Sequence, residues 1–323
     1  MKYIFPDYYK EFECIKGLCR HNCCIGWEID IDDNAAAAYE SLKGPFGEKL
    51  KECIAPETDD APPHFILGEK ERCPFLNKDN LCEIIITLGE NALCNICAAH
   101  PRFVNGYENR TETGLGLCCE AATTLILSKK EPVRLVDECG QPVESDPDDP
   151  ILLLRDRVID ILQDRTLDLS ERLDKMLVEA GSDFSSETIQ KNLSRYTSFL
   201  AGLERLDEEW TIRLNELTEF LKDASEEDFC DFDRYMKNRR TEYEQLAVYF
   251  TYRYFALAPD SDYVAERAAF TAFSVLLIRS LGAARFNKTG EFSFYEQSEI
   301  ARLFSAEIEY SEDNLYDVMG LFS

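Results

Sequence analysis

Cysteine is the residue type with the most chemistry to offer in this 323-residue chain. Twelve of the thirteen cysteines lie between Cys14 and Cys139. Most stand in close groups, with the spacings Cys14-x4-Cys19-x3-Cys23-Cys24, Cys73-x8-Cys82, Cys94-x2-Cys97 and Cys118-Cys119. Thiolates packed so densely repel one another unless a soft cation neutralises them, so these spacings indicate a zinc or iron–sulfur site.

Two other uses of cysteine compete with metal binding. The chain opens with Met1-Lys2-Tyr3-Ile4-Phe5-Pro6, where the proline interrupts any apolar signal-peptide core, so we expect a cytoplasmic protein. Disulfide bonds are rare in that reducing compartment, and the cysteine count is odd. Isolated cysteines usually pack as small apolar residues, and this is the use expected of Cys53, Cys139 and Cys230.

The spacing separates zinc from iron–sulfur less sharply. A zinc ribbon needs two CxxC pairs, and only Cys94-x2-Cys97 has that form. The CxxxCxxC pattern of radical S-adenosylmethionine enzymes is not matched either, because Cys23 is followed directly by Cys24. Adjacent cysteine side chains diverge, so this pair indicates two centres or one ligand beside a spectator. The irregular spacing favours an iron–sulfur cluster, with zinc as the alternative.

The elements that must position these thiols are few. In the first 140 residues we expect helices over 34–42 and 118–127, and a strand or helical turn over 83–88. So little regular structure implies that metal ligation supplies folding free energy there. Residues 140–150, with three prolines and four acids, are typical of a linker.

Beyond this linker the pattern is helical. Apolar residues recur at helical spacing in two stripes, Leu169, Leu173, Met176, Leu177 and Tyr243, Leu246, Ala247, Phe250, Tyr254, Leu257. Ser225 with Asp228 three residues later indicates a helix start, and Pro259-Asp260-Ser261 separates one helical run from another over 263–281. The expected fold is mainly α: an irregular cysteine-rich, metal-stapled N-terminal domain over 1–140, followed by an all-helical bundle domain over 150–323.

The charge of the chain restricts its partners. With 62 acidic and 35 basic residues the net charge is −27, which repels phosphate backbones and anionic lipid, so neither nucleic acid nor a membrane is expected as partner. No apolar run approaches the roughly 20 residues of a membrane span. An acidic surface can simply keep the protein soluble. The more specific alternative is that it attracts a basic substrate.

Ordered motifs in residues 1–130 carry a family resemblance. They are Phe12-Glu13-Cys14, Cys19-x3-Cys23-Cys24-Ile25-Gly26-Trp27, Cys73-Pro74-Phe75-Leu76-Asn77 to Leu81-Cys82, Cys97-x2-His100-Pro101-Arg102-Phe103 and Leu117-Cys118-Cys119-Glu120. Together they resemble the flagellin lysine-N-methylase family. A part of this set also resembles the broader family of zinc- or iron-chelating cysteine-rich domains.

The resemblance implies methyl transfer from S-adenosylmethionine to lysine side chains of flagellin or another lysine-bearing protein, with a [4Fe–4S] cluster associated with activity. The cysteines that it implies as metal ligands are Cys14, Cys19, Cys23, Cys24, Cys73, Cys82, Cys97 and Cys118. Cys94 and Cys119 fall outside this set. The only close glycine pair of the domain is Gly114-x-Gly116, so S-adenosylmethionine would bind in another way than on a glycine-rich strand and turn.

The remaining site residues follow from the chemistry. Lysine attacks a sulfonium methyl only as a neutral amine, so the site needs a base within hydrogen-bond reach. Glu120 and His100 are the catalytic candidates, although each can also be a packed or paired structural residue. Trp27 and Arg102 are the cofactor candidates, through stacking on adenine and pairing with a carboxylate. The hypothesis from another class is a metal-binding interaction or sensor protein without catalysis.

Overall fold

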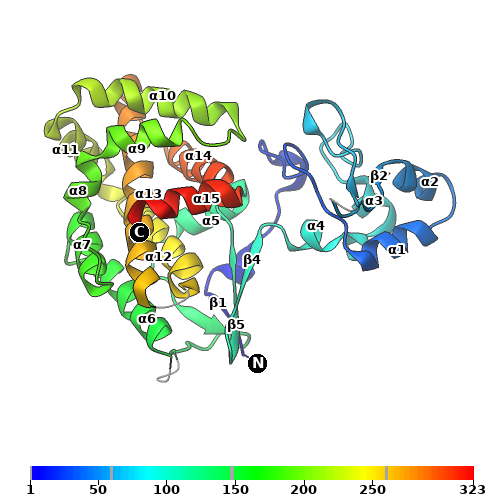
Figure 1. The fold of residues 1–323 in the computed structure, drawn as a ribbon, viewed down its shortest axis with the longest axis horizontal. Helices are drawn as coiled ribbons and strands as arrows, with labels where there is room; N and C mark the ends of the chain where they lie inside the picture. The colour runs from blue at the N-terminus through cyan, green and yellow to red at the C-terminus, as the bar shows by residue number, and fades with distance from the viewer. Residues whose placement is uncertain (1, 59–60, 146–148, 259–260) are drawn as a thin grey trace. The chain divides into compact units, whose positions relative to one another are not determined.

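The computed structural model describes residues 2–58, 61–145, 149–258 and 261–323 of the chain. They divide into two compact units (Figure 1). We call Met1–Phe12 with Val104–Ser323 the helical unit, and Glu13–Phe103 the cysteine unit. The expected mainly helical fold is confirmed, since helices dominate the described residues and strands are short. The expected boundary at 140–150 differs from the division that the structure shows.

A small sheet explains this difference. Among the described residues its four strands are ordered β4-β5-β1-β6, with bounds β4 Arg102–Gly106, β5 Arg110–Leu115, β1 Lys2–Pro6 and β6 Leu135–Asp137. The first strand, β1, pairs in parallel with β5 and antiparallel with β6. The N-terminal residues and the segment after residue 104 therefore belong to one hydrogen-bonded layer.

The expected linker is tied to the same layer. The Val143 amide donates to the Leu135 carbonyl over 3.0 Å, and an Arg110 Nη2 donates to the Ser145 hydroxyl over 3.1 Å. Residues 146–148 lie outside the described part. A proline- and acid-rich composition thus marks a connection within the helical unit rather than a boundary between domains.

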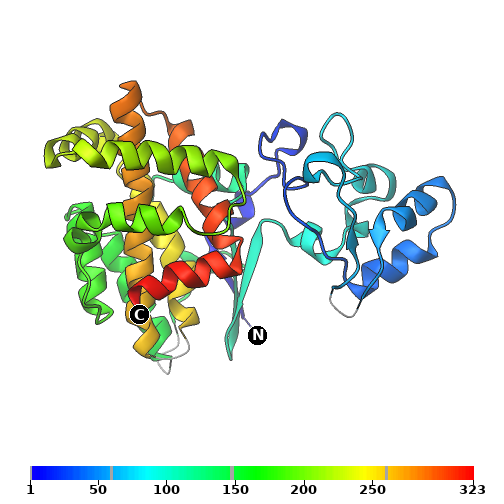
Figure 2. The ribbon, with the colours of Figure 1, turned by 45° about the horizontal axis from the view of Figure 1, so that its top comes forward.

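The helices of the helical unit surround one long central helix. They are α5 Glu120–Ser128, α6 Pro150–Leu162, α7 Leu169–Glu179, α8 Ser186–Lys191, α9 Leu193–Leu200, α10 Glu208–Asp223, α11 Glu226–Tyr235, α12 Thr241–Tyr254, α13 Ser261–Thr289, α14 Phe294–Phe304 and α15 Glu312–Met319. The central helix is α13, which contacts α7, α8, α10, α11, α12, α14 and α15. Figures 1 and 2 show α10 and α15 crossing it. Its middle stretch, from Ala268 to Ile278, is buried at every residue, as expected of a helix enclosed by others.

This central helix also bears on the membrane question. Residues Tyr263–Thr289 are long and apolar enough to span a membrane by length and composition, although no run of consecutive apolar residues suggested it. However, 83% of the apolar window is buried within the protein. Such burial fits the core helix of a soluble protein.

Local sequence signals account for several helix ends. Ser225 forms a capping box with Asp228 at the start of α11, so the helix start expected there is confirmed. The two apolar stripes are confirmed in their centres, where Leu173 and Phe250 are fully buried. Leu257, expected in the second stripe, is 43% exposed because the chain leaves α12 at Tyr254.

The cysteine unit has its own apolar core. Its elements are α1 Asp33–Ser41, α2 Pro45–Glu52, β2 Ile54–Ala55, β3 His64–Phe65, α3 Glu83–Leu88 and α4 Asn95–Ala99. The expected helix over 34–42 is confirmed, and residues 83–88 are helical. Phe65 and Phe75 pack edge to face at 5.2 Å between ring centroids, and Cys73 and Cys94 are buried beside them. Apolar packing therefore contributes to this unit alongside any metal.

Three isolated cysteines do not all behave as expected. Cys53 is partly buried against the core of the cysteine unit. Cys139 and Cys230 are exposed, so the expected use as buried apolar residues is wrong for these two. Cys139 lies in the turn after β6 and Cys230 among the acids of α11.

Candidate functional site

The cysteine unit brings six thiols into one neighbourhood. We call Cys23, Cys24, Cys73, Cys82, Cys94 and Cys97 the thiol cluster. A backbone hydrogen bond holds Cys73 next to the Cys23-Cys24 pair: the Cys73 amide donates to the Cys24 carbonyl over 2.9 Å. Cys82 and Cys94 stand directly before α3 and α4, and Cys97 lies within α4. Loop pairing and two helix starts thus position the sulfur atoms.

The thiols of the cluster are close enough to shift one another's pKa values. The Cys24 side chain hydrogen-bonds to Cys23 and lowers the pKa of Cys23 to about 7, while the same contact and burial raise the pKa of Cys24. Thiolate charge on Cys73 and Cys97 raises the pKa of Cys24 further. Burial raises the pKa of Cys73 to about 11, with a smaller effect from Cys82.

The second close pair behaves in the same way. A hydrogen bond from Cys97 lowers the pKa of Cys94 to about 7. That hydrogen bond, burial and the charges of Cys94, Cys73 and Cys82 raise the pKa of Cys97. Each pair therefore ionises one thiol first, and further deprotonation requires a cation to offset the repulsion.

The thiol cluster suits a soft metal in its chemistry but does not enclose one. Thiolate sulfur is the preferred ligand of iron–sulfur clusters and of zinc. Across the part of the chain that the structure describes, no three or more His, Cys, Asp or Glu side chains converge closely enough to hold a metal ion. The thiols are thus neighbours with the right donor atoms, and a ligand set would require their side chains to turn.

The sequence-predicted ligands divide into two groups. The thiol cluster contains five of them, Cys23, Cys24, Cys73, Cys82 and Cys97, together with Cys94, which the family resemblance did not include. The other three are bonded elsewhere. Cys14 accepts a hydrogen bond from the Lys16 amide over 3.4 Å and Cys19 donates to the His21 carbonyl over 3.2 Å, while Cys118 belongs to the helical unit.

Two further predicted residues lie beside the thiol cluster. The Trp27 ring nitrogen donates to the Cys23 carbonyl over 2.6 Å, and its ring centroid is 6.0 Å from that of His100. Trp27 also packs against the core of the cysteine unit, which gives it a structural role besides the adenine stacking predicted for it. Burial lowers the pKa of His100 to about 4, and the Arg102 charge adds to this. A histidine held neutral in this way is a weak base.

The lowered pKa of His100 leads to a pH prediction. The unfolded chain binds the His100 proton near pH 6.5 and the folded chain only near pH 4, so this residue favours the folded state fully above pH 6.5. Its contribution is lost as the pH falls from 6.5 to 4, by about 2–3 kcal/mol. Urea unfolding at pH 7 and pH 4.5 should show a larger loss for the wild type than for His100→Gln. Equal losses in both proteins would contradict this assignment.

Glu120 and Cys118 occupy the helical unit, at the start of α5. Glu120 lies in the first turn of this helix and is half-buried. The Cys118 sulfur is hydrogen-bonded to the Tyr310 hydroxyl, and burial raises the pKa of Cys118. The predicted catalytic residues Glu120 and His100 therefore come from different units.

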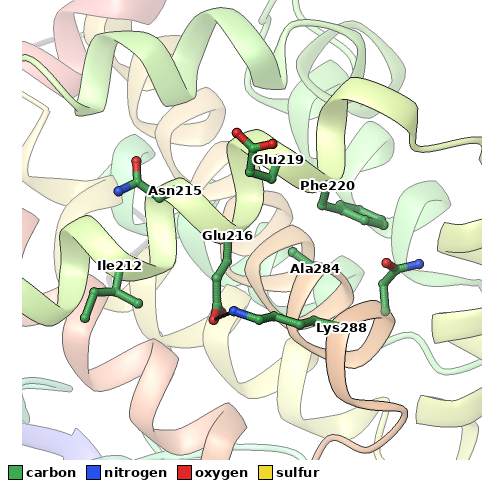
Figure 3. A pocket seen from close by; sticks show the side chains of 8 residues that line it. Ile212, Asn215, Glu216, Glu219, Phe220, Ala284 and Lys288 are labelled. Carbon is green, nitrogen blue, oxygen red and sulfur yellow. Dashed lines mark hydrogen bonds and ion pairs between the residues drawn. The ribbon is translucent and has the colours of Figure 1, made fainter.

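An open pocket also lies in the helical unit, between α10 and α13 (Figure 3). Its volume is about 550 Å³. Glu216 bonds there to Lys288 at 2.8 Å and to Arg213 at 3.0 Å, so its charge is already balanced. The pocket holds none of the residues predicted from the sequence. Its lining is Ile212, Asn215, Glu216, Glu219, Phe220, Ala284, Asn287 and Lys288.

Comparison with known proteins bears on the helical unit. Residues 175–323 match the model of the FliB lysine N-methylase C-terminal domain. A lysine-N-methylase of Salmonella typhimurium and one of Salmonella choleraesuis are each 28% identical over 147 residues, covering 41% of this chain and 34% of the relative. The flagellar biosynthetic protein FliU of Salmonella muenchen is 28% identical over 144 residues, covering 40% of this chain and 79% of FliU. No solved structure matches.

These matches complete the resemblance that the cysteine motifs raised. The match spans about a third of the length of the two lysine-N-methylases. The ordered motifs of residues 1–130 and the family model over residues 175–323 both point to lysine N-methylases. Through these regions the chain is similar to the flagellin lysine-N-methylases.

Proposed function

We propose that this protein is an S-adenosylmethionine-dependent protein-lysine N-methyltransferase that acts in the cytoplasm on flagellin or another lysine-bearing protein. The observation that carries the proposal is the match of residues 175–323 to the C-terminal domain of a lysine N-methylase. The relatives named lysine-N-methylase and flagellar biosynthetic protein support the acceptor and its context. The net charge of −27 suits a cationic acceptor.

The second part of the proposal concerns the thiol cluster. We propose that it holds a [4Fe–4S] cluster, with zinc as the alternative metal. The residues that would hold it come from the thiol cluster: Cys73, Cys82 and members of the two close pairs, Cys23 with Cys24 and Cys94 with Cys97. Such a cluster would supply a redox-active centre. The protein's own residues would orient it through the loop pairing of Cys24 with Cys73.

The reaction places demands on the protein residues. The lysine must reach the sulfonium methyl as a neutral amine, so a carboxylate or imidazole near it must take up the proton. Glu120, half-buried at the start of α5, is one candidate for this role. His100 is held neutral by burial and its pKa near 4 makes it a poor acceptor.

One experiment tests both parts. The chain is purified without oxygen, analysed for iron, sulfide and zinc, and incubated with S-adenosylmethionine and flagellin, and methylated lysines are then located by mass spectrometry. We expect iron and sulfide in the protein and methyl groups on flagellin. Colourless protein with stoichiometric zinc would contradict the cluster. Absence of transfer to flagellin and to other lysine-bearing proteins would instead favour the metal-binding interaction or sensor protein.

A further inference from the structure

A buried polar network of the helical unit has no part in the thiol cluster. We call Tyr249, Arg253, Tyr254, Glu309 and Tyr310 the Glu309 cluster. The first three residues come from α12, and Glu309 ends a short π-helical segment, Ser305–Glu309, directly after α14. Segments with π-helical geometry are frequent at functional sites. All five residues lie within the region that matches the lysine N-methylase domain.

The carboxylate of Glu309 is the centre of this network. It accepts hydrogen bonds from the Tyr249 hydroxyl at 2.9 Å and from the Tyr254 hydroxyl at 2.7 Å. Arg253 pairs with it at 3.1 Å. The Glu309 side chain is fully buried, and an ion pair removed from water in this way is a weak source of stability, because desolvation offsets the attraction. The clearer effect of this ion pair and its hydrogen bonds is to fix the conformation of the side chains around Glu309.

The second half of the network points to Tyr310. The Arg253 guanidinium lies 5.1 Å from the Tyr254 ring centroid and 5.7 Å from the Tyr310 ring centroid. A cation between two aromatic faces orients both rings. The Tyr310 hydroxyl is in turn hydrogen-bonded to the Cys118 sulfur, so the ring is fixed at its face and at its tip.

Exposure sets Tyr310 apart from the residues that hold it. Tyr310 is 38% exposed, whereas Tyr249 is 2%, Tyr254 6% and Glu309 7% exposed. The network therefore ends in one oriented aromatic side chain, part of whose surface an incoming molecule can reach. A tyrosine offers such a molecule an apolar face and a hydroxyl oxygen that accepts a hydrogen bond.

We infer, on the basis of the proposed function, that Tyr310 receives the acceptor lysine, with its ring along the aliphatic chain and its hydroxyl oxygen accepting a hydrogen bond from the amine. Arg253 and Glu309 are positioning residues that hold the ring. With one N–H bound to the hydroxyl, the amine lone pair is oriented toward the methyl donor. The lone pair forms the N–C bond as the sulfonium C–S bond breaks, S-adenosylhomocysteine leaves as a neutral thioether, and the surplus proton on nitrogen passes to water.

The test compares Tyr310→Phe with Tyr316→Phe in the anaerobically purified full chain. Tyr316 is a matched control, since it lies on α15 of the same unit and is 63% exposed. With S-adenosylmethionine and flagellin peptides that contain one lysine, Tyr310→Phe should lower kcat by about 10- to 100-fold, because the amine loses its orientation. It should leave the KM for the peptide within about threefold, because the ring remains. Tyr316→Phe should match the wild type.

Two more variants separate contact from structure. Tyr310→Ala removes the ring and should raise KM as well as lower kcat. Glu309→Gln keeps two hydrogen bonds but not the charge, and should lower kcat with little change in KM. Urea midpoints are measured for every variant. Wild-type kcat in Tyr310→Phe, or a kcat loss that tracks a lowered midpoint, would overturn the role of Tyr310. A wild-type protein that transfers no methyl group would instead overturn the proposed function, and this inference with it.

Discussion

Replacing Glu112 by leucine should lower the free energy of unfolding of the helical unit by about 3–5 kcal/mol, because it leaves the buried Arg155 with only its longer contact to Asp156 at 3.3 Å. Glu112 lies on β5 with its side chain fully buried. It pairs with Arg155 at 2.5 Å and with Arg110 at 2.7 Å. Arg155 has no exposed side-chain surface, so it cannot turn to water when the carboxylate is removed. Urea denaturation followed by circular dichroism measures the loss.

An exposed ion pair of the same unit supplies the control. Arg157 and Glu179 lie 3.0 Å apart with 57% and 39% of their side chains exposed. Because water screens such pairs, Glu179→Leu should cost less than about 1 kcal/mol. If both variants unfold at the same urea concentration, the buried network does not stabilise this unit in the way that its geometry indicates.

Serine in place of Cys73 or Cys97 should lower iron binding by at least about tenfold, and it should make the cysteine unit sensitive to protease. Cys73 is 6% exposed, and its charge and that of Cys97 act on the same neighbouring thiols. A hydroxyl is a poor ligand for a soft metal, so the substitution removes a donor without changing the size of the side chain much. Iron and sulfide analysis and limited proteolysis of anaerobic protein are the measurements.

Cys230→Ser is the matched control for these variants. Cys230 is exposed on α11 of the helical unit, so its substitution should leave iron content and proteolysis unchanged. Complete chelation of the wild type should open Glu13–Phe103 before the helical unit. Iron retained equally in Cys73→Ser and Cys230→Ser would show that the thiol cluster is not the metal site.

Periodicity predicted the helices better than composition predicted the domains. A stripe such as Leu173 with Leu177 records one helix face directly, so the helical part follows from the sequence. The division into units does not, because it depends on pairing between β1 and β5, whose residues are more than a hundred positions apart. Nothing in the sequence of Lys2–Pro6 indicates that this strand pairs with β5.

The site shows the same limit. Cysteine spacing identified the residues of the thiol cluster, but Cys94 was recovered only once its contact with Cys97 was known. Cys118 was grouped with the other cysteines because they are close in sequence, whereas its bonding partner, Tyr310, is far along the chain. The residues around Glu309 were missed altogether, since tyrosines at helical spacing are ordinarily core residues. The sequence feature that could have indicated a buried carboxylate here is Glu309 between the apolar residues Ile308 and Tyr310.

The parallel pairing of β1 with β5 has a consequence for how the protein is made. The ribosome completes β1 first, but Arg110, the partner of Lys2, emerges only after all of Glu13–Phe103. At about 5–20 residues per second this interval lasts about 5–20 seconds. In gene-architecture terms the cysteine unit is an insertion inside the helical unit. It can therefore fold, and bind the metal proposed for it, during translation, before the partner of the N-terminal strand has been synthesised.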